Sequence, residues 1–170
     1  LDNVFWGTEC IGRERRRLAP LTPLETEPDV VESFLRLRTT DGCDLSTIVL
    51  IESSSDIEIS SSTTPAQRKL GYNKLMRAAA ILCACVVDKP IRSEISNPWS
   101  AYSLMKDYVV SVTWKDGTTT AFSKPLCIEE ATAAKGLCKT VYVRPIQQNV
   151  NLASAVFANA PLACAVGITQ

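Results

Sequence analysis

Histidine is absent from all 170 residues of the sequence. This absence excludes Ser-His-Asp and Cys-His nucleophile sites, metal sites built on two histidines, and an imidazole acid or base. Gly-rich phosphate loops of the P-loop and dinucleotide types are also missing, as is any C-x-x-C pair. The enzyme classes that depend on these groups are therefore excluded.

Excess charge of either sign is missing as well, because 18 Lys plus Arg balance 18 Asp plus Glu. With an isoelectric point of about 6.5, the chain is not expected to bind by neutralising the phosphates of nucleic acids or of an anionic membrane. The longest apolar stretches, 78–87 and 152–168, are too short or too interrupted to span a bilayer. We therefore predict no nucleic-acid partner and no integral membrane segment.

Cysteine, in contrast, is plentiful. The spacing does not suit zinc, which favours tandem C-x2-C pairs or His partners, and it is more typical of disulfides formed in an oxidising compartment. Six of the seven cysteines are expected to be bridged, with Cys127–Cys138 as a local pair around a short helix; buried thiols in a cytosolic or viral protein are the alternative. The seven disulfide candidates are Cys10, Cys43, Cys83, Cys85, Cys127, Cys138 and Cys164.

The first half of the chain predicts a strand-plus-helix unit over residues 1–90. Three prolines interrupt residues 1–33, which predicts an extended arm. Residues 34–40 and 45–51 form an expected hairpin around Asp41-Gly42, and residues 56–60 form a third strand. Thr64, Pro65 and Gln67 have the spacing of a helix start, and the periodic apolar residues after them predict a long helix that could change to a strand near residue 80.

Prolines 90 and 98 predict a linker over about 88–100, followed by a β-rich unit over 100–170. Its predicted elements are a hairpin over 108–123, a short helix over 128–135 and a strand over 140–144. No residue from 145 to 170 is charged, which predicts strands at 150–158 and 162–169 shielded on both faces. The fold class expected from the whole sequence is α+β and β-rich, in two small units, the second a β-sandwich or barrel-like unit, with disulfides.

Carboxylates are the only plentiful acid or base groups left. Glu129 and Glu130, or Asp56 and Glu58, could supply the paired carboxylates of a glycosidase. However, adjacent residues on a helix point about 100° apart, and alternate residues of a strand more simply form its solvated face. The sequence therefore predicts no catalytic residue, no cofactor and no metal ligand.

Binding is then expected to depend on exposed polar positions. A hairpin tip at Lys115, Asp116 and Gly117 and a polar helix face formed by Glu129, Glu130 and Lys135 are the predicted interaction surface. The oligomeric state is not predicted.

In cysteine number, in the boundary near Pro90 to Pro98 and in its β-rich second half, the chain resembles the secreted cysteine-rich effectors of plant-pathogenic fungi. Its layout is similar to that of the dual-domain effectors secreted into host xylem. The resemblance implies a secreted, non-enzymatic virulence protein that binds host components and is detected by a plant immune receptor. A chain that begins at Leu1, with no basic and apolar leader, agrees with a processed secretory product.

Two other classes of protein stay open on the sequence. A viral coat subunit would also combine buried thiols, a proline-rich arm and uncharged C-terminal strands. A histidine-free hydrolase would use the paired carboxylates. The state of the cysteines separates the effector from the coat subunit, because the effector is expected to have disulfides and the coat subunit buried thiols.

Overall fold

The computed structural model describes residues 3–6, 9–18, 30–39, 44–63, 72–158 and 167–169, with side chains described for 30–37, 46–60 and 72–158. Its strands form one ten-stranded mixed sheet in the order β10-β1-β2-β3-β4-β5-β6-β9-β7-β8. The strands are β1 (Asn3–Trp6), β2 (Glu9–Leu18), β3 (Val30–Thr39), β4 (Asp44–Glu52), β5 (Ile57–Thr63), β6 (Ile91–Glu94), β7 (Val110–Trp114), β8 (Thr119–Ala121), β9 (Cys138–Val143) and β10 (Gly167–Thr169). The helices are α1 (Tyr72–Val86), α2 (Pro98–Asp107), α3 (Ile128–Ala134) and α4 (Gln147–Ala158).

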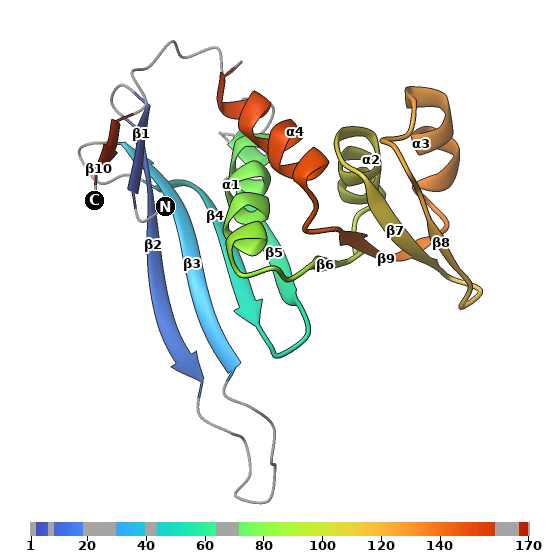
Figure 1. Ribbon diagram of the computed structural model, residues 1–170, viewed down its shortest axis with the longest axis horizontal. Coiled ribbons are helices and arrows are strands. Elements are labelled where there is room, and N and C mark those ends of the chain that lie inside the picture. Colours follow the sequence, from blue (N-terminus) through green and yellow to red (C-terminus); the bar gives the residue numbers. More distant parts are fainter. Residues whose placement is uncertain are drawn as a thin grey trace, which may run out of the picture.

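The long antiparallel strands β2 to β5 form one side of the molecule (Figure 1). In β3, Leu35 and Leu37 are buried while Phe34 and Arg36, which precede them in turn, are half-buried, so the strand alternates between a core face and an open face. The predicted hairpin from residue 34 to residue 51 and the third strand after it are confirmed as β3, β4 and β5. Two further strands, β1 and β2, lie within the segment that the sequence predicts as an arm.

The second half of the chain extends the same sheet. The strand β6 pairs with β5 on one side and with β9 on the other, and β9 pairs with β7, which pairs with β8. The predicted hairpin over 108–123, the helix over 128–135 and the strand over 140–144 are confirmed as β7–β8, α3 and β9. The prediction of two separate units, with a sandwich or barrel in the second, is wrong because a single sheet runs through both halves.

The two prolines that suggested a linker mark the starts of ordered elements. The carbonyl of Pro90 accepts the N–H of Ile57 at 2.9 Å, immediately before β6 begins. Pro98 occupies the first turn of α2, after Asn97, whose side chain caps the helix by accepting the N–H of Trp99 at 3.0 Å. A division of the chain near residues 88–100 stays a prediction, which limited proteolysis would test.

Helices α1 and α4 lie side by side, with α4 on the side of α1 toward β7 to β9 (Figure 1). α1 packs its apolar face on β3 to β6, with Met76, Ala80 and Ile81 fully buried. The predicted strand at 150–158 is wrong, because residues 147–158 are helical. Absence of charge indicates shielding but not the kind of element, and here Asn149 and Ala153, four residues apart, form the buried side of a helix.

The predicted disulfides are also wrong. Cys83, Cys85, Cys127 and Cys138 are all thiols in the structure; the side chains of Cys10, Cys43 and Cys164 lie outside the described residues. Cys127 is exposed at the N-cap of α3, whereas Cys138 is buried beyond the other end of that helix. A seven-residue helix is about 10 Å long, which keeps its two ends too far apart for a disulfide.

This arrangement predicts that Cys127 is a surface thiol. A Cys127→Ser variant is expected to lose one thiol from the group that reacts rapidly with 5,5′-dithiobis(2-nitrobenzoate) in the folded protein, because Cys83 and Cys138 are buried. Serine keeps the cap acceptor that Cys127 Sγ supplies to the N–H of Glu130. Unchanged rapid thiol counts in parent and variant would contradict the exposed position.

Candidate functional site

The sheet opens between β5 and β6, its only parallel neighbours among the described strands. Their pairing covers two residue pairs, Ile57 with Ile91 and Glu58 with Arg92, although β5 continues to Thr63 and β6 to Glu94. The two strands therefore run apart toward their carboxyl ends. Ligands of open sheets bind outside the carboxyl ends of strands where a crossover changes the strand order, which is the position of this opening.

Backbone polar groups face the opening from both strands. Ser53 donates its N–H to Asp56 O within the β4–β5 hairpin, so the backbone of Asp56 points toward β4. The next residue, Ile57, donates its N–H to Pro90 O and therefore points toward β6. Because backbone groups alternate along a strand, those of Ser61 and Thr63 also point away from β4. Since Ile95 donates to Lys139 O in β9, the backbone of Glu94 points toward β5. Among the described strands, β5 and β6 pair no further than Glu58 with Arg92, so no strand pairing is formed by Ser61 and Thr63 on this side.

Helix α1 lies in the crossover from β5 to β6, so its N-terminus follows the carboxyl end of β5. The helix is 15 residues long and has no acidic residue in its first turn. The N–H groups and the dipole of such a helix end favour a negatively charged ligand group. The opening thus combines backbone groups that no described strand pairs with and a helix end that favours an anion.

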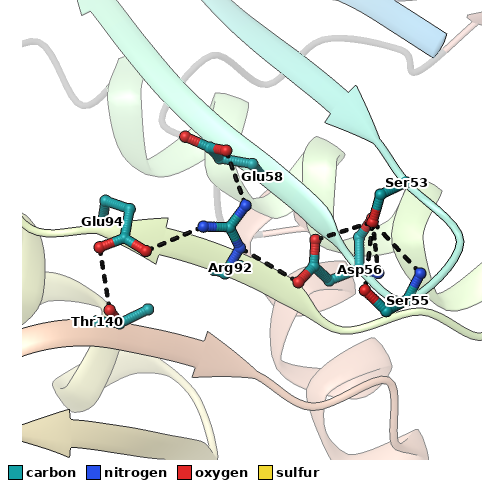
Figure 2. A network of polar contacts seen from close by, with 7 residues as sticks. All are labelled: Ser53, Ser55, Asp56, Glu58, Arg92, Glu94 and Thr140. Carbon is teal, nitrogen blue, oxygen red and sulfur yellow. Dashed lines mark hydrogen bonds and ion pairs between the residues drawn. The ribbon is translucent and has the colours of Figure 1, made fainter. Parts of the chain in front are cut away.

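A cluster of charged side chains lies where β5 and β6 still pair (Figure 2). The Arg92 guanidinium on β6 donates to three carboxylates: Asp56 at 3.2 Å, Glu58 at 2.8 Å and Glu94 at 2.9 Å. Three carboxylates and one guanidinium leave a formal net charge of −2. Burial lowers the pKa of Arg92, but the hydrogen bond with Glu94 and the nearby negative charges outweigh it and raise that pKa.

The Arg92 cluster lies on the face of the sheet that α1 leaves uncovered. Ile57, Ile59 and Ile91 point into the core under α1, so the residues between them point to the opposite face. Glu94 is held further by Thr140 on β9, whose hydroxyl donates to its second oxygen at 3.0 Å. The side chain of Glu94 is half exposed, so the cluster is open to solvent beside the opening.

A second site is a hollow of about 780 Å³ between the β7–β8 hairpin and α3. The Lys115 N–H donates to Leu137 O at 2.9 Å and ties the hairpin to the turn after α3. Six of its ten lining residues are apolar. The lining consists of Trp114, Lys115, Asp116, Thr118, Phe122, Leu126, Glu130, Ala133, Ala134 and Leu137.

The predicted interaction surface lies around this hollow. Lys115, Asp116 and Glu130 line it, so the structure brings the hairpin tip and the helix face together. Gly117 turns the hairpin tip with a positive φ of 89°, a conformation that favours glycine. Glu129 is exposed outside the lining. The Lys135 ammonium lies 5.0 Å from the centre of the Trp99 ring and so links α3 to α2.

Sequence reasoning missed Arg92 and the opening. It placed Asp56 and Glu58 on a solvated strand face, but it gave no role to the basic residue at 92 or to Glu94. Arg92 and Glu94 are two residues apart, as are Asp56 and Glu58, which is the spacing of two strands that present charges on one face. This shared spacing was the signal in the sequence that could have pointed to the cluster. The pairing of β5 with β6, which brings the two segments together, joins residues far apart in the chain and could not be predicted from local patterns.

Comparisons with known proteins give one structural likeness. No protein-family model and no curated protein matches the chain. Among solved structures, the chain is similar to a spermidine N-acetyltransferase, a chimera of SpeG from Vibrio cholerae and hSSAT, at 11% identity and a TM-score of 0.47. The match covers 71% of this chain and 69% of the other. At this distance the likeness transfers neither an activity nor a site residue.

These findings correct the reading as a fungal effector. The described cysteines are thiols, and one sheet runs through both halves of the described chain, so the disulfides and the two-unit layout that carried the resemblance are not borne out. The resemblance to cysteine-rich effectors, and the non-enzymatic virulence function that it implied, are therefore wrong. A secreted location and a host-protein partner stay predictions. Of the described helices, none has the length and hydrophobicity that a membrane span requires.

Proposed function

We propose that the protein is an acyltransferase that takes an acyl group from an acyl-coenzyme A and passes it to a cationic amine. The observation that carries the proposal is the early end of the β5–β6 pairing, which leaves an opening within the sheet.

The backbone groups of the opening favour a donor that carries amides. Buried or enclosed N–H and C=O groups need hydrogen-bond partners, and an extended ligand with its own amides can supply them as an added strand does. Coenzyme A has an amide-bearing arm that ends in a thiol and begins at a pyrophosphate. The groups of Ser61, Thr63 and Glu94 suit the arm, and the N-terminus of α1 suits the phosphates.

The Arg92 cluster favours a cationic acceptor. Its net charge of −2 favours a cation, and its position on the uncovered face lets an acceptor approach without crossing the helix layer. The carboxylates are fixed by Arg92 and Thr140, so they orient a bound ammonium group with little rearrangement. An acceptor with two amino groups could leave one on the cluster while the other, unprotonated, reaches the opening.

The chemistry required is a substitution at a thioester carbonyl. The bound donor supplies an activated acyl group: the amine nitrogen forms a bond to the carbonyl carbon, the C–S bond breaks, and coenzyme A leaves. The nitrogen loses one proton and the thiolate gains one, so atoms and charge balance. This chain contributes orientation of the two reactants, which alone can supply a large part of a rate enhancement.

Calorimetry of the purified chain with acetyl-coenzyme A tests the proposal. We expect binding at least about tenfold tighter than that of adenosine 3′,5′-bisphosphate, which lacks the amide arm. Mass spectrometry should then show acetylation of a diamine with equal release of coenzyme A, and much less acetylation of glutamate. No heat of binding with about 1 mM acetyl-coenzyme A, a level that reveals affinities near −4 kcal/mol, would overturn the proposal.

A further inference from the structure

The hollow beside α3 has the size and rigidity of a small-molecule site. Its volume of about 780 Å³ falls within the usual range of about 300–1,000 Å³ for ligand pockets. Backbone hydrogen bonds fix its rim: Trp114 N–H donates to Thr118 O at 2.8 Å, and Leu137 N–H donates to Ala134 O at 3.0 Å. The walls are therefore formed before any ligand arrives.

The inner wall is apolar and aromatic. Trp114 and Phe122 meet edge to face with their ring centres 6.5 Å apart, and Trp114 Nε1 donates to Thr120 Oγ1 at 2.9 Å. Both rings are thus held in position while they line the hollow. Leu137, also in the lining, is 60% exposed, a large value for a leucine on a surface. An apolar ligand body would cover this surface.

The charged side chains that line the hollow have a negative net charge. Asp116 and Glu130 against Lys115 leave a net charge of −1, and none of the three makes an ion pair in the part of the chain that the structure describes. Thr118 holds the Asp116 carboxylate through its N–H at 2.8 Å and its hydroxyl. Cys127 N–H holds Glu130 at 3.0 Å. These hydrogen bonds lower the pKa of Asp116 and of Glu130, so both stay charged at neutral pH.

We propose that this hollow binds a small organic monocation with an apolar, ring-bearing body, such as an arylalkylammonium. The two fixed carboxylates neutralise its charge, and the rings of Trp114 and Phe122 pack against its body and offer their negative faces to the cation. An anion would instead add to the negative sum at the rim. The site is separate from the opening between β5 and β6, so this inference does not depend on the proposed acyl transfer.

Calorimetry with benzyltrimethylammonium tests the proposal on the full chain. We expect saturable binding of one cation per chain, at least about tenfold tighter than that of tetramethylammonium, which lacks the ring, or of benzyl alcohol, which lacks the charge. Asp116→Asn and Glu130→Gln are each expected to weaken binding about threefold, and the double variant about tenfold. Both substitutions keep an oxygen acceptor for the local hydrogen bonds. Ala133→Phe, which places a ring inside the hollow, should weaken binding at least about tenfold.

Glu129→Gln is the matched control, because Glu129 is an exposed neighbour on the same helix outside the lining. It should leave the affinity within about twofold of the parent, and circular dichroism should show all variants folded. Equal affinity for benzyl alcohol would overturn the proposal, as would benzyltrimethylammonium binding that the double variant and Ala133→Phe leave unchanged. Should Ala133→Phe fail to fold, the two conservative variants decide.

Discussion

Replacing Asn149 by alanine is expected to lower the free energy of unfolding by about 3–5 kcal/mol. The side chain is fully buried, and its Oδ1 accepts the N–H of Val109 at 2.8 Å. Its Nδ2 donates to the carbonyls of Val109 and Arg144, both at 2.8 Å. Alanine removes these three hydrogen bonds and leaves the N–H of Val109 without its partner inside the core, which costs more than the loss of an exposed hydrogen bond.

Urea unfolding followed by circular dichroism measures the effect, and Asn151→Ala is the matched control. Asn151 lies two residues further along α4 and is exposed, and its side chain accepts a hydrogen bond from the side chain of Gln147. Its loss is expected to change the free energy of unfolding by no more than about 0.5 kcal/mol. If both variants unfold at the same urea concentration, Asn149 does not hold α4 to the ends of β7 and β9 as described.

Asn149 also illustrates what the sequence could not reveal. The absence of charge from residue 145 onward predicts strands, because strands shielded on both faces lack charge. A helix that packs one side on another helix needs no charge either, provided its polar residues are amides such as Gln147 and Asn151. The 40 residues that separate Asn149 from Val109 place this hydrogen bond beyond any local pattern.

Local patterns did predict the hairpins. In β3, Leu35 and Leu37 alternate with Arg36 and Arg38, and an apolar run follows in β4. The residues of β7 also alternate between apolar and polar side chains, and Lys115 to Gly117 then supply the turn. A hairpin depends on neighbours in sequence, so alternation and a turn are sufficient to define it. Asn97 followed by Pro98 is an equally local signal of a helix start, but the sequence analysis predicts a linker there and no helix, so α2 was missed.

The two candidate sites depend on long-range pairing. One wall of the opening, β5, corresponds to the predicted strand over 56–60, but the other, β6, lies in the segment predicted as a linker. Only the parallel register of β5 with β6 brings Arg92 to Asp56 and Glu58. The hollow was predicted in part: its rim residues Lys115, Asp116 and Glu130 were named as surface positions. Its apolar wall was not, because the sequence cannot show that Leu137 stays exposed.

Proline in place of Ser61 is expected to weaken the binding of acetyl-coenzyme A at least about tenfold without unfolding the sheet. Ser61 lies opposite Ile48 of β4, in a position whose N–H points away from β4 and into the opening. Proline has no N–H, and it is tolerated in a strand where the N–H does not serve the ladder. The β4–β5 hydrogen bonds therefore remain, while the opening loses one donor and gains a ring.

Ser61→Ala and Ser60→Pro separate the possible causes. The alanine variant also lacks the hydroxyl but keeps the N–H, so it should bind acetyl-coenzyme A within about twofold of the parent. Ser60 lies opposite Val49 with its N–H directed to β4, so proline there should destabilise the fold by about 3 kcal/mol. A folded Ser61→Pro variant that binds acetyl-coenzyme A as tightly as Ser61→Ala would show that the backbone of β5 does not hold the donor. Proline should therefore weaken donor binding at residue 61 and destabilise the fold at residue 60, because the N–H groups of the two residues point to opposite sides of β5.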